Sequence, residues 1–182
     1  MRIVAGRNKG RILLTPDDRA TRPSADRLRE AVFSMLNSRG LPQEARVLDV
    51  FAGTGAMGLE AYSRGAAKVV LIEKEAAAQR LVTENIKRVR GEADCKLVAR
   101  DATQPGLPPP GFAADLVFLD PPYGQGLNEA ALAALDKAGW LAPGVLVIAE
   151  HEFREDPAWP AGFAVEDRRR YGKGAVSILA RA

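Results

Sequence analysis

Apolar residues in this chain alternate between short continuous runs and longer stretches with helical spacing. The continuous runs are 46–51 (RVLDVF), 68–73 (KVVLIE), 95–100 (CKLVAR), 114–120 (ADLVFLD) and 144–151 (GVLVIAEH), and they predict five strands. The intervening stretches 56–65, 74–89 and 127–140 have the spacing of helices. Strands that are apolar along their whole length are buried on both faces, so the pattern predicts a mostly parallel sheet with helices on each side.

The two ends of the chain add further elements. Residues 1–14 read as a short hairpin around a glycine-containing turn, and Ser24 is a candidate N-cap for a helix to about Asn37. Residues 163–181 read as two strands joined by a basic turn. We therefore predict an α/β fold, a doubly wound, mostly parallel seven-stranded sheet. Residues 1–40 would form an N-terminal basic extension and residues 41–182 the main domain.

Composition limits the possible classes of protein. The 182 residues are 47% apolar and 27% charged, which suits one globular domain. One cysteine excludes an internal disulfide, and one histidine makes a zinc site or a catalytic triad a poor fit. No run approaches the ~18 apolar residues of a membrane span, and the first residues do not read as a secretory signal. We expect a cytoplasmic protein without a membrane or metal partner.

Positive charge is concentrated at the start of the chain. The net charge is +3, but residues 1–30 contain eight basic and four acidic side chains, which leaves −1 for the other 152 residues. Such a distribution favours an anionic partner, nucleic acid above all, although a solvated surface would give the same count. The candidate RNA contacts are Arg2, Arg7, Lys9, Arg11 and Arg22. Arg22 and Arg27 could instead order a loop over a cofactor. A second cluster, Arg168, Arg169, Arg170 and Lys173, could also contact RNA, but the sequence does not decide its role.

A glycine-rich loop follows the first predicted strand. Gly53, Gly55 and Gly58 fit G-x-G-x-x-G, and Glu73 lies 20 residues after Gly53, which is the fingerprint of dinucleotide binding. Glycines in a tight strand-to-helix turn can also be purely structural. Asp49 argues against a dinucleotide, because a carboxylate beside the loop repels the pyrophosphate that a helix N-terminus would otherwise attract.

Acidic residues lie at the ends of the first four predicted strands: Asp49, Glu73, Asp101 and Asp120. In parallel sheets these ends share one edge, where ligands bind. A cationic nucleoside, S-adenosyl-L-methionine, would explain the first three, since its charge, ribose hydroxyls and adenine amine all suit carboxylates. Each acid also has a structural alternative: Asp49 could cap a turn, Glu73 could pair with a lysine, and Asp101 could start a helix.

The fourth predicted strand runs directly into Asp120, Pro121, Pro122 and Tyr123. This DPPY sequence resembles the [DN]-P-P-[YFW] motif of class I amino-methyltransferases. In that interpretation Asp120 and the Pro121 carbonyl accept hydrogen bonds from an exocyclic amine, the prolines fix the backbone, and Tyr123 stacks on the base. The proton can leave after methyl transfer, so no strong base is needed.

Three stretches together resemble the RsmD family, bacterial enzymes that methylate the N2 amine of a guanine in 16S rRNA: MRIVAGRNKGRILL (1–14), TRPSADRLREAVFSML (21–36) and VLDVFAGTGAMGLEAYSRGA (47–66). The resemblance covers residues 1 to about 125 and implies S-adenosyl-L-methionine as cofactor. It also implies 16S rRNA within the small ribosomal subunit or its assembly intermediate as substrate, with neighbouring ribosomal proteins as further contacts, and a monomeric enzyme. It assigns residues 120–123 to catalysis and a second group to the cofactor, namely Asp49, Phe51, Gly53, Thr54, Gly55, Glu73, Lys74, Asp101 and Ala102.

Two alternatives remain open at this point. An adenine-N6 methyltransferase acting on RNA or DNA would share the DPPY motif, and motif spacing does not distinguish the two bases. A nucleic-acid-binding module without activity could retain the glycine loop as a relic. Neither the modified nucleotide nor the need for ribosomal proteins follows from the sequence.

Overall fold

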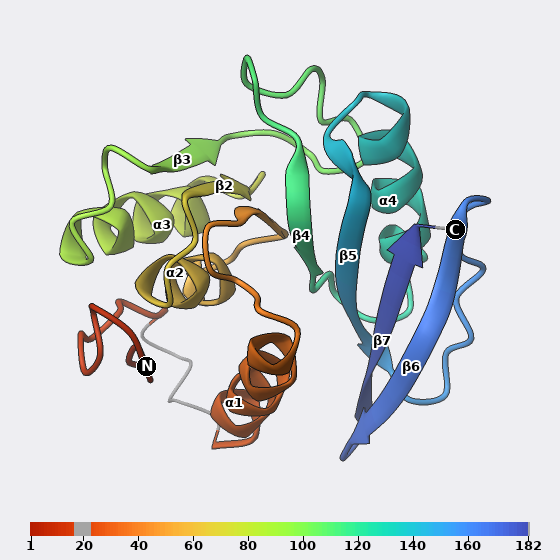
Figure 1. Cartoon of the computed structure of the whole chain (residues 1–182), viewed down its shortest axis with the longest axis horizontal. Coiled ribbons are helices and arrows are strands. Elements are labelled where there is room, and N and C mark those ends of the chain that lie inside the picture. Colours follow the sequence, from red (N-terminus) through yellow and green to blue (C-terminus); the bar gives the residue numbers. More distant parts are fainter. Residues whose placement is uncertain (17–22, 182) are drawn as a thin grey trace.

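A computed structural model describes residues 1–16 and 23–181 of the chain. Apart from the N-terminal hairpin, its helices and strands match the predicted elements, with bounds that differ by a few residues (Figure 1). Ser24, the candidate N-cap, lies inside the first helix, which begins at Pro23. In chain order they are α1 (Pro23–Ser38), β1 (Arg46–Val50), α2 (Ala56–Ser63), β2 (Lys68–Ile72), α3 (Ala76–Arg88), β3 (Cys95–Val98), β4 (Ala114–Leu119), α4 (Leu127–Lys137), β5 (Leu141–Glu152), β6 (Phe163–Tyr171) and β7 (Gly174–Arg181).

The strands form one seven-stranded sheet in the order β3-β2-β1-β4-β5-β7-β6. Neighbouring strands from β3 to β5 are parallel, whereas β7 is antiparallel to both β5 and β6. The predicted mostly parallel, doubly wound sheet is therefore confirmed. Strand order reverses direction between β1 and β4, and the crevice at such a switch point is where ligands bind in open α/β sheets.

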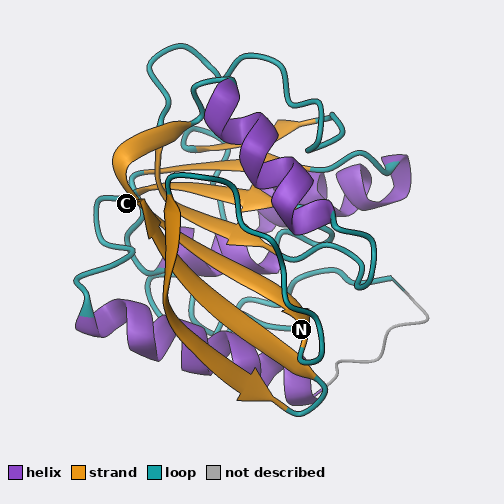
Figure 2. Ribbon diagram, turned by 90° about the vertical axis from the view of Figure 1, so that its right-hand side faces the viewer, coloured by secondary structure: helices purple, strands orange, loops and turns teal. Residues whose placement is uncertain are grey.

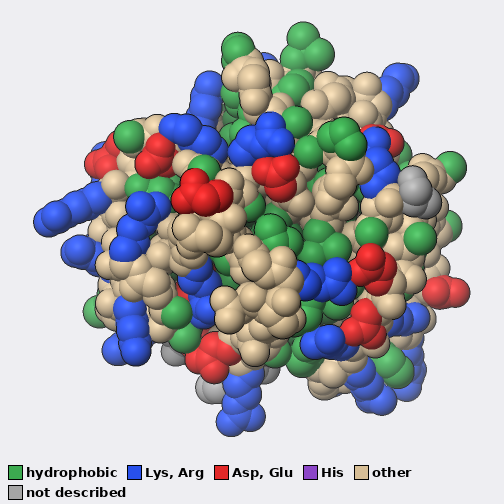
Figure 3. All heavy atoms as spheres, in the orientation of Figure 1, with side chains coloured by type: hydrophobic (Ala, Val, Ile, Leu, Met, Phe, Trp, Pro, Cys, Tyr) green, Lys and Arg blue, Asp and Glu red, His purple; other side chains and the backbone are tan. Residues whose placement is uncertain are grey.

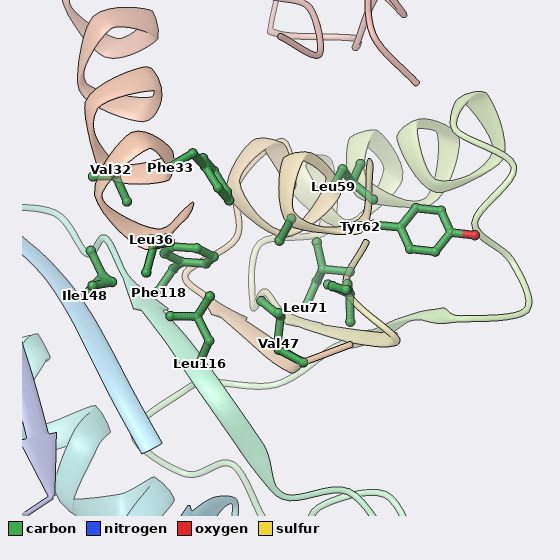
Figure 4. Packing of buried hydrophobic residues seen from close by; sticks show 14 of the residues in the cluster. Val32, Phe33, Leu36, Val47, Leu59, Tyr62, Leu71, Leu116, Phe118 and Ile148 are labelled. Carbon is green, nitrogen blue, oxygen red and sulfur yellow. The ribbon is translucent and has the colours of Figure 1, made fainter. Parts of the chain in front are cut away.

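Helices cover both faces of this sheet, as Figure 2 shows. On one face, α1, α2 and α3 pack against strand residues such as Val47, Leu71 and Phe118 (Figure 4). On the other face, α4 and Trp140 pack against Leu48 and the alternate residues of the same strands. Strand side chains point alternately to the two faces, so strands buried on both faces need the continuous apolar runs seen in the sequence.

The predicted N-terminal hairpin differs in detail from the expectation. It folds back on itself, but only one antiparallel bridge forms, between Arg2 and Ile12, in place of two paired strands. Its position comes instead from the main domain, because the buried carboxylate of Glu60 on α2 accepts hydrogen bonds from Val4 N (2.9 Å) and Ala5 N (3.1 Å). Tertiary contact thus replaces strand pairing here.

Helix α1 shares its core with the rest of the chain. Val32, Phe33 and Leu36 are buried in the same cluster as residues of the sheet, and the Phe33 and Phe118 rings lie 5.6 Å apart. The division between residues 1–40 and 41–182 stays a prediction. None of the helices in the described parts of the chain combines the length and hydrophobicity that a bilayer span requires.

Candidate cofactor and substrate site

The glycine-rich loop joins β1 to α2 with an unusual backbone. Phe51, Gly53 and Gly55 all have positive φ angles, of 60°, 58° and 79°. A Cβ atom on Gly55 would lie 2.9 Å from the Leu71 side chain, and one on Gly58 would lie 2.9 Å from Val69. Glycine is therefore required at 55 by backbone conformation and space, and at 58 by the close approach of α2 to the sheet.

Asp49 lies within β1, on the face that α2 covers. Its side chain is buried, and Oδ2 accepts a hydrogen bond of 2.8 Å from the backbone N–H of Gly58 in the first turn of the helix. Burial raises the pKa of Asp49 to about 7, and the nearby charge of Glu73 also raises it. The turn-capping alternative is thus realised, and it leaves a carboxyl group that a positive charge would help to ionise.

Glu73 follows β2 directly and binds the loop from its other side. Its carboxylate accepts hydrogen bonds from Gly53 N and Glu75 N, both of 2.8 Å. Two amides of the loop region, those of Gly53 and Gly58, are therefore already bound to carboxylates. A pyrophosphate would need such amides free and the acids absent, so the dinucleotide interpretation loses its main support.

The lysine-pairing alternative for Glu73 is not realised among the described residues. Lys68 pairs with Asp94 (2.7 Å), and Lys74 approaches Asp101 (3.9 Å). Asp101 lies in a turn after β3, where Oδ1 accepts from the N–H (2.8 Å) and hydroxyl (2.7 Å) of Thr103. These bonds lower the pKa of Asp101 and keep it ionised.

The other assigned loop residues contribute backbone and packing. The Thr54 carbonyl accepts a hydrogen bond of 2.8 Å from Asn85 of α3, whose side chain also binds the N–H and carbonyl of Leu14. Ala102 is buried beside Asp101, and Phe51 packs partly against the core. Asn85 thus ties the glycine loop to the N-terminal segment, a role for which the sequence carries no local signal.

The DPPY motif begins where β4 ends. Val50 of β1 and Leu119 of β4 are paired in register, so the glycine loop and the motif leave the sheet at neighbouring positions. Asp120 is exposed and makes interactions within the protein, and Pro121 is buried. Tyr123 has 43% of its surface exposed, while its hydroxyl donates a 2.6 Å hydrogen bond to Glu150 of β5. Burial and this bond raise the pKa of Tyr123.

A cavity of about 250 Å³ adjoins the motif. Pro121 and Tyr123 line it together with the start of α4 and the end of β5. Its charged side chains are acidic: Glu129, Glu150, Glu155 and Asp156. Glu150 was missed in the sequence, although it lies near the carboxyl end of the fifth parallel strand and continues the series of acids at strand ends.

The predicted RNA contacts separate into three groups. Arg7, Lys9 and Arg11 line a groove of about 480 Å³ together with Arg88 of α3, which the sequence did not single out. Arg2 is exposed but lies outside that groove, and Arg22 lies outside the described residues. Figure 3 shows Lys and Arg side chains along the border of the molecule that carries the hairpin and α3. Arg7 also lies over the Tyr62 ring, 3.8 Å from its centroid.

The second basic cluster makes mostly local contacts. Arg168 donates to the carbonyls of Phe153 and Glu155 at 2.7 Å, Arg169 pairs with Asp167 at 2.8 Å, and Arg170 lies over the Phe153 ring. Arg168 and Arg170 thus hold the segment after β5 that borders the acidic cavity. The cluster's contact with RNA stays open.

Trp140, Trp159 and His151 pack inside the protein. Trp140 is fully buried and Trp159 packs against the same core. His151 is buried, with one ring nitrogen 2.9 Å from the Glu152 carbonyl and the other 2.8 Å from the Ser177 hydroxyl. These two contacts hold the His151 ring within the packed interior.

Comparisons with known proteins agree with this geometry. The model of the family described as "Conserved hypothetical protein 95" matches residues 1–180. "Ribosomal RNA small subunit methyltransferase D" of Escherichia coli K12 is 35% identical over all of this chain and 90% of its own length. The Haemophilus influenzae protein of the same name is 33% identical, over 84% of this chain and 79% of its own. The solved structure of yhhF from E. coli superposes with a TM-score of 0.85, at 34% identity, over 100% and 97% of the two chains.

Proposed function

This chain belongs to the RsmD family of methyltransferases, and from that premise we propose that it methylates the exocyclic N2 amine of a guanine in 16S rRNA, with S-adenosyl-L-methionine as methyl donor. The observation that carries the proposal is the register between β1 and β4, which puts a carboxylate-bound glycine loop beside the DPPY motif. A donor pocket and an amine-binding motif at one sheet edge are what methyl transfer to an amine requires.

The residues at the loop fit a cationic nucleoside. Asp49, Glu73 and Asp101 offer carboxylates, and a Cβ on Gly53 would meet only the Phe51 carbonyl within 4 Å, at 3.9 Å, so the backbone there is open to a close ligand. We assign the positive charge of the donor to the neighbourhood of Asp49 and its ribose hydroxyls to Glu73. Asp101 would accept from the adenine amine. When bound, S-adenosyl-L-methionine supplies an electrophilic methyl group on a sulfonium.

The protein's own contribution to the chemistry lies in residues 120–123. The lone pair of an exocyclic base amine is delocalised into the ring, which makes the nitrogen a poor nucleophile. The Asp120 carboxylate and the Pro121 carbonyl would hold both amine hydrogens, which directs the lone pair out of the ring plane. Tyr123 offers its exposed ring face to the extruded base. His151 is among the residues that line the adjoining cavity, but it is buried, and no base is needed if the proton leaves last.

The alternative base is adenine, whose N6 amine the same motif could hold. The relatives' name favours ribosomal RNA as the polymer, and the notably basic hairpin supports an RNA partner. We also propose that the RNA is recognised within the small subunit or its assembly intermediate, with contact to ribosomal proteins. The enzyme is proposed to act as a monomer.

Methyl transfer from labelled S-adenosyl-L-methionine tests the proposal directly. The purified protein is incubated with small subunits from cells that lack this enzyme, with free 16S rRNA and with DNA, and the labelled nucleoside is identified. We expect N2-methylguanosine in the ribosomal RNA. N6-methyladenosine, or label in DNA alone, would show that the substrate is assigned wrongly. Failure to bind the donor in calorimetry would favour the binding-module alternative.

The pH dependence of cofactor affinity tests the role of Asp49. Its pKa is raised to about 7 from an ordinary value of 3.8, so this group destabilises the folded state as pH rises between those values. A positively charged ligand favours the ionised form, so its affinity should rise with pH in that window. Calorimetry with S-adenosyl-L-methionine, which carries the sulfonium charge, should find a gain of about fivefold between about pH 6 and about pH 7. Asp49→Asn should remove this gain, and an equally steep profile in the variant would exclude Asp49 as its source.

A further inference from the structure

The Tyr123 hydroxyl is hydrogen-bonded to one oxygen of the Glu150 carboxylate, and the second oxygen can accept a further hydrogen bond. Oε1 of Glu150 accepts the 2.6 Å hydrogen bond from Tyr123, and no hydrogen bond to Oε2 is found within residues 1–16 and 23–181. The backbone at Glu150 is fixed as well, because its carbonyl accepts from Asn128 of α4 at 2.8 Å. The carboxylate therefore stands in a defined position at the hydroxyl end of the tyrosine ring.

The space beside this carboxylate favours donors over acceptors. The cavity that Tyr123 and Glu150 line has four acidic side chains and no lysine or arginine among its described lining residues. Two of the acids are already used, since Glu155 accepts from Gly124 N and Glu152 N, and Glu129 accepts from Ala158 N. Asn128 is buried, and its Oδ1 has no hydrogen-bond partner within the described chain. Acceptors thus predominate around Glu150.

We propose that Glu150 is a specificity-determining residue, which accepts a hydrogen bond from N1–H of the target guanine and thereby selects guanine over adenine. The inference rests on the proposed function, since it concerns the base that the DPPY motif holds. A base stacked on the Tyr123 ring has its edge near the perimeter of the ring, where the Glu150 carboxylate lies.

Guanine and adenine differ in the group at N1, and this difference determines which base Glu150 would favour. Guanine carries a hydrogen on N1 next to its N2 amine, so both neighbouring groups are donors. Adenine has an unprotonated N1 next to its N6 amine, and this lone pair would face the carboxylate. A site built to accept a donor rejects the analogue that lacks it, because the second oxygen of the partly buried carboxylate would then face a lone pair in place of a donor. Glu150 would resolve the ambiguity that the shared motif leaves.

Glu150→Gln tests this with two matched substrates. One RNA carries the target guanine, and the other carries 2-aminopurine at that position, which keeps the N2 amine but has an acceptor at N1. We expect the wild-type protein to prefer guanine by about 10- to 100-fold in kcat/KM. A glutamine can still accept from Tyr123 through its oxygen while its amide donates to N1 of 2-aminopurine. The preference should therefore shrink by about tenfold or more.

A control variant and the donor affinity separate this role from a structural one. Glu152→Gln removes the same charge from the same strand, but Glu152 is not among the residues that line the cavity, so its preference should equal that of the wild type. Binding of S-adenosylhomocysteine should be equal in all three proteins. An unchanged preference in Glu150→Gln, or an equal loss of kcat/KM on both substrates, would overturn the inference. The proposed function would still stand if the wild type forms N2-methylguanosine. Absence of that product would overturn the proposed function itself.

Discussion

Asp120→Ala is expected to lower kcat by about 10²- to 10³-fold, which is the usual cost of deleting one group that stabilises a transition state. The hydrogen bond from the target amine to the carboxylate would strengthen as the nitrogen becomes tetrahedral and positively charged, so its loss raises the barrier more than it weakens binding. Asp120 follows β4, whereas the carboxylates assigned to the donor lie within β1 (Asp49) and after β2 and β3 (Glu73 and Asp101). Donor affinity should therefore stay within about twofold of the wild type.

Single-turnover methylation of undermodified small subunits, with calorimetry of S-adenosylhomocysteine, measures the two quantities separately. Asp120→Asn is the matched control, because the amide oxygen can still accept one hydrogen bond and the motif to which this loop is similar admits asparagine. It should retain more activity than the alanine variant. A parallel loss of donor affinity and turnover in Asp120→Ala would show that the side chain shapes the loop instead of contacting the amine.

The strands of this protein could be predicted because burial dictates their composition. A run such as 69–72 is apolar at every position only if both faces are covered, and the alternation of such runs with helices then fixes a mostly parallel sheet. The hairpin was less predictable. Its sequence favours a turn, but whether the two arms pair depends on partners such as Glu60, some 55 residues away.

The donor side of the site was also accessible, because parallel strands bring their carboxyl ends to one edge. Asp49, Glu73 and Asp101 follow from that rule alone. Their surroundings do not: that Asp49 is buried against Gly58 depends on which face of β1 it occupies and on how closely α2 approaches. Glu150 was not predicted for a related reason. A single acid in an apolar run has no evident function in the sequence until the fold shows that Tyr123 is its partner.

The basic groove is the part of the site that only the folded chain assembles. Lys9 and Arg11 come from the hairpin and Arg88 from the end of α3. Arg88 donates a 3.4 Å hydrogen bond to the Ile12 carbonyl, so helix and hairpin meet at the groove. Met1 lies 4.0 Å from Thr54, which places the same N-terminal segment next to the glycine loop. RNA held in this groove would lie close to the donor pocket.

Replacing Lys9, Arg11 and Arg88 together by glutamine is expected to weaken RNA binding about 100-fold at about 0.1 M salt. Each phosphate contact with single-stranded RNA contributes a slope of about −0.7 in a plot of log affinity against log salt, so three lost contacts should flatten that slope by about 2. Arg7 is left in place because it stacks on Tyr62 and its loss would also disturb the hairpin. Titration of 16S rRNA fragments at several salt concentrations measures both quantities.

A control variant with the same change in net charge shows whether the weaker RNA binding depends on the position of the lost charges or only on the net charge. Arg39, Lys96 and Lys137 are exposed cations at the end of α1, on β3 and at the end of α4, away from the groove. Their replacement by glutamine should leave the salt slope nearly unchanged, because no phosphate contact is lost there. An equal flattening in both triple variants would assign RNA binding to overall charge. If the groove variant regains wild-type kcat at saturating RNA, binding and the Asp120 chemistry are carried by separate parts of the chain.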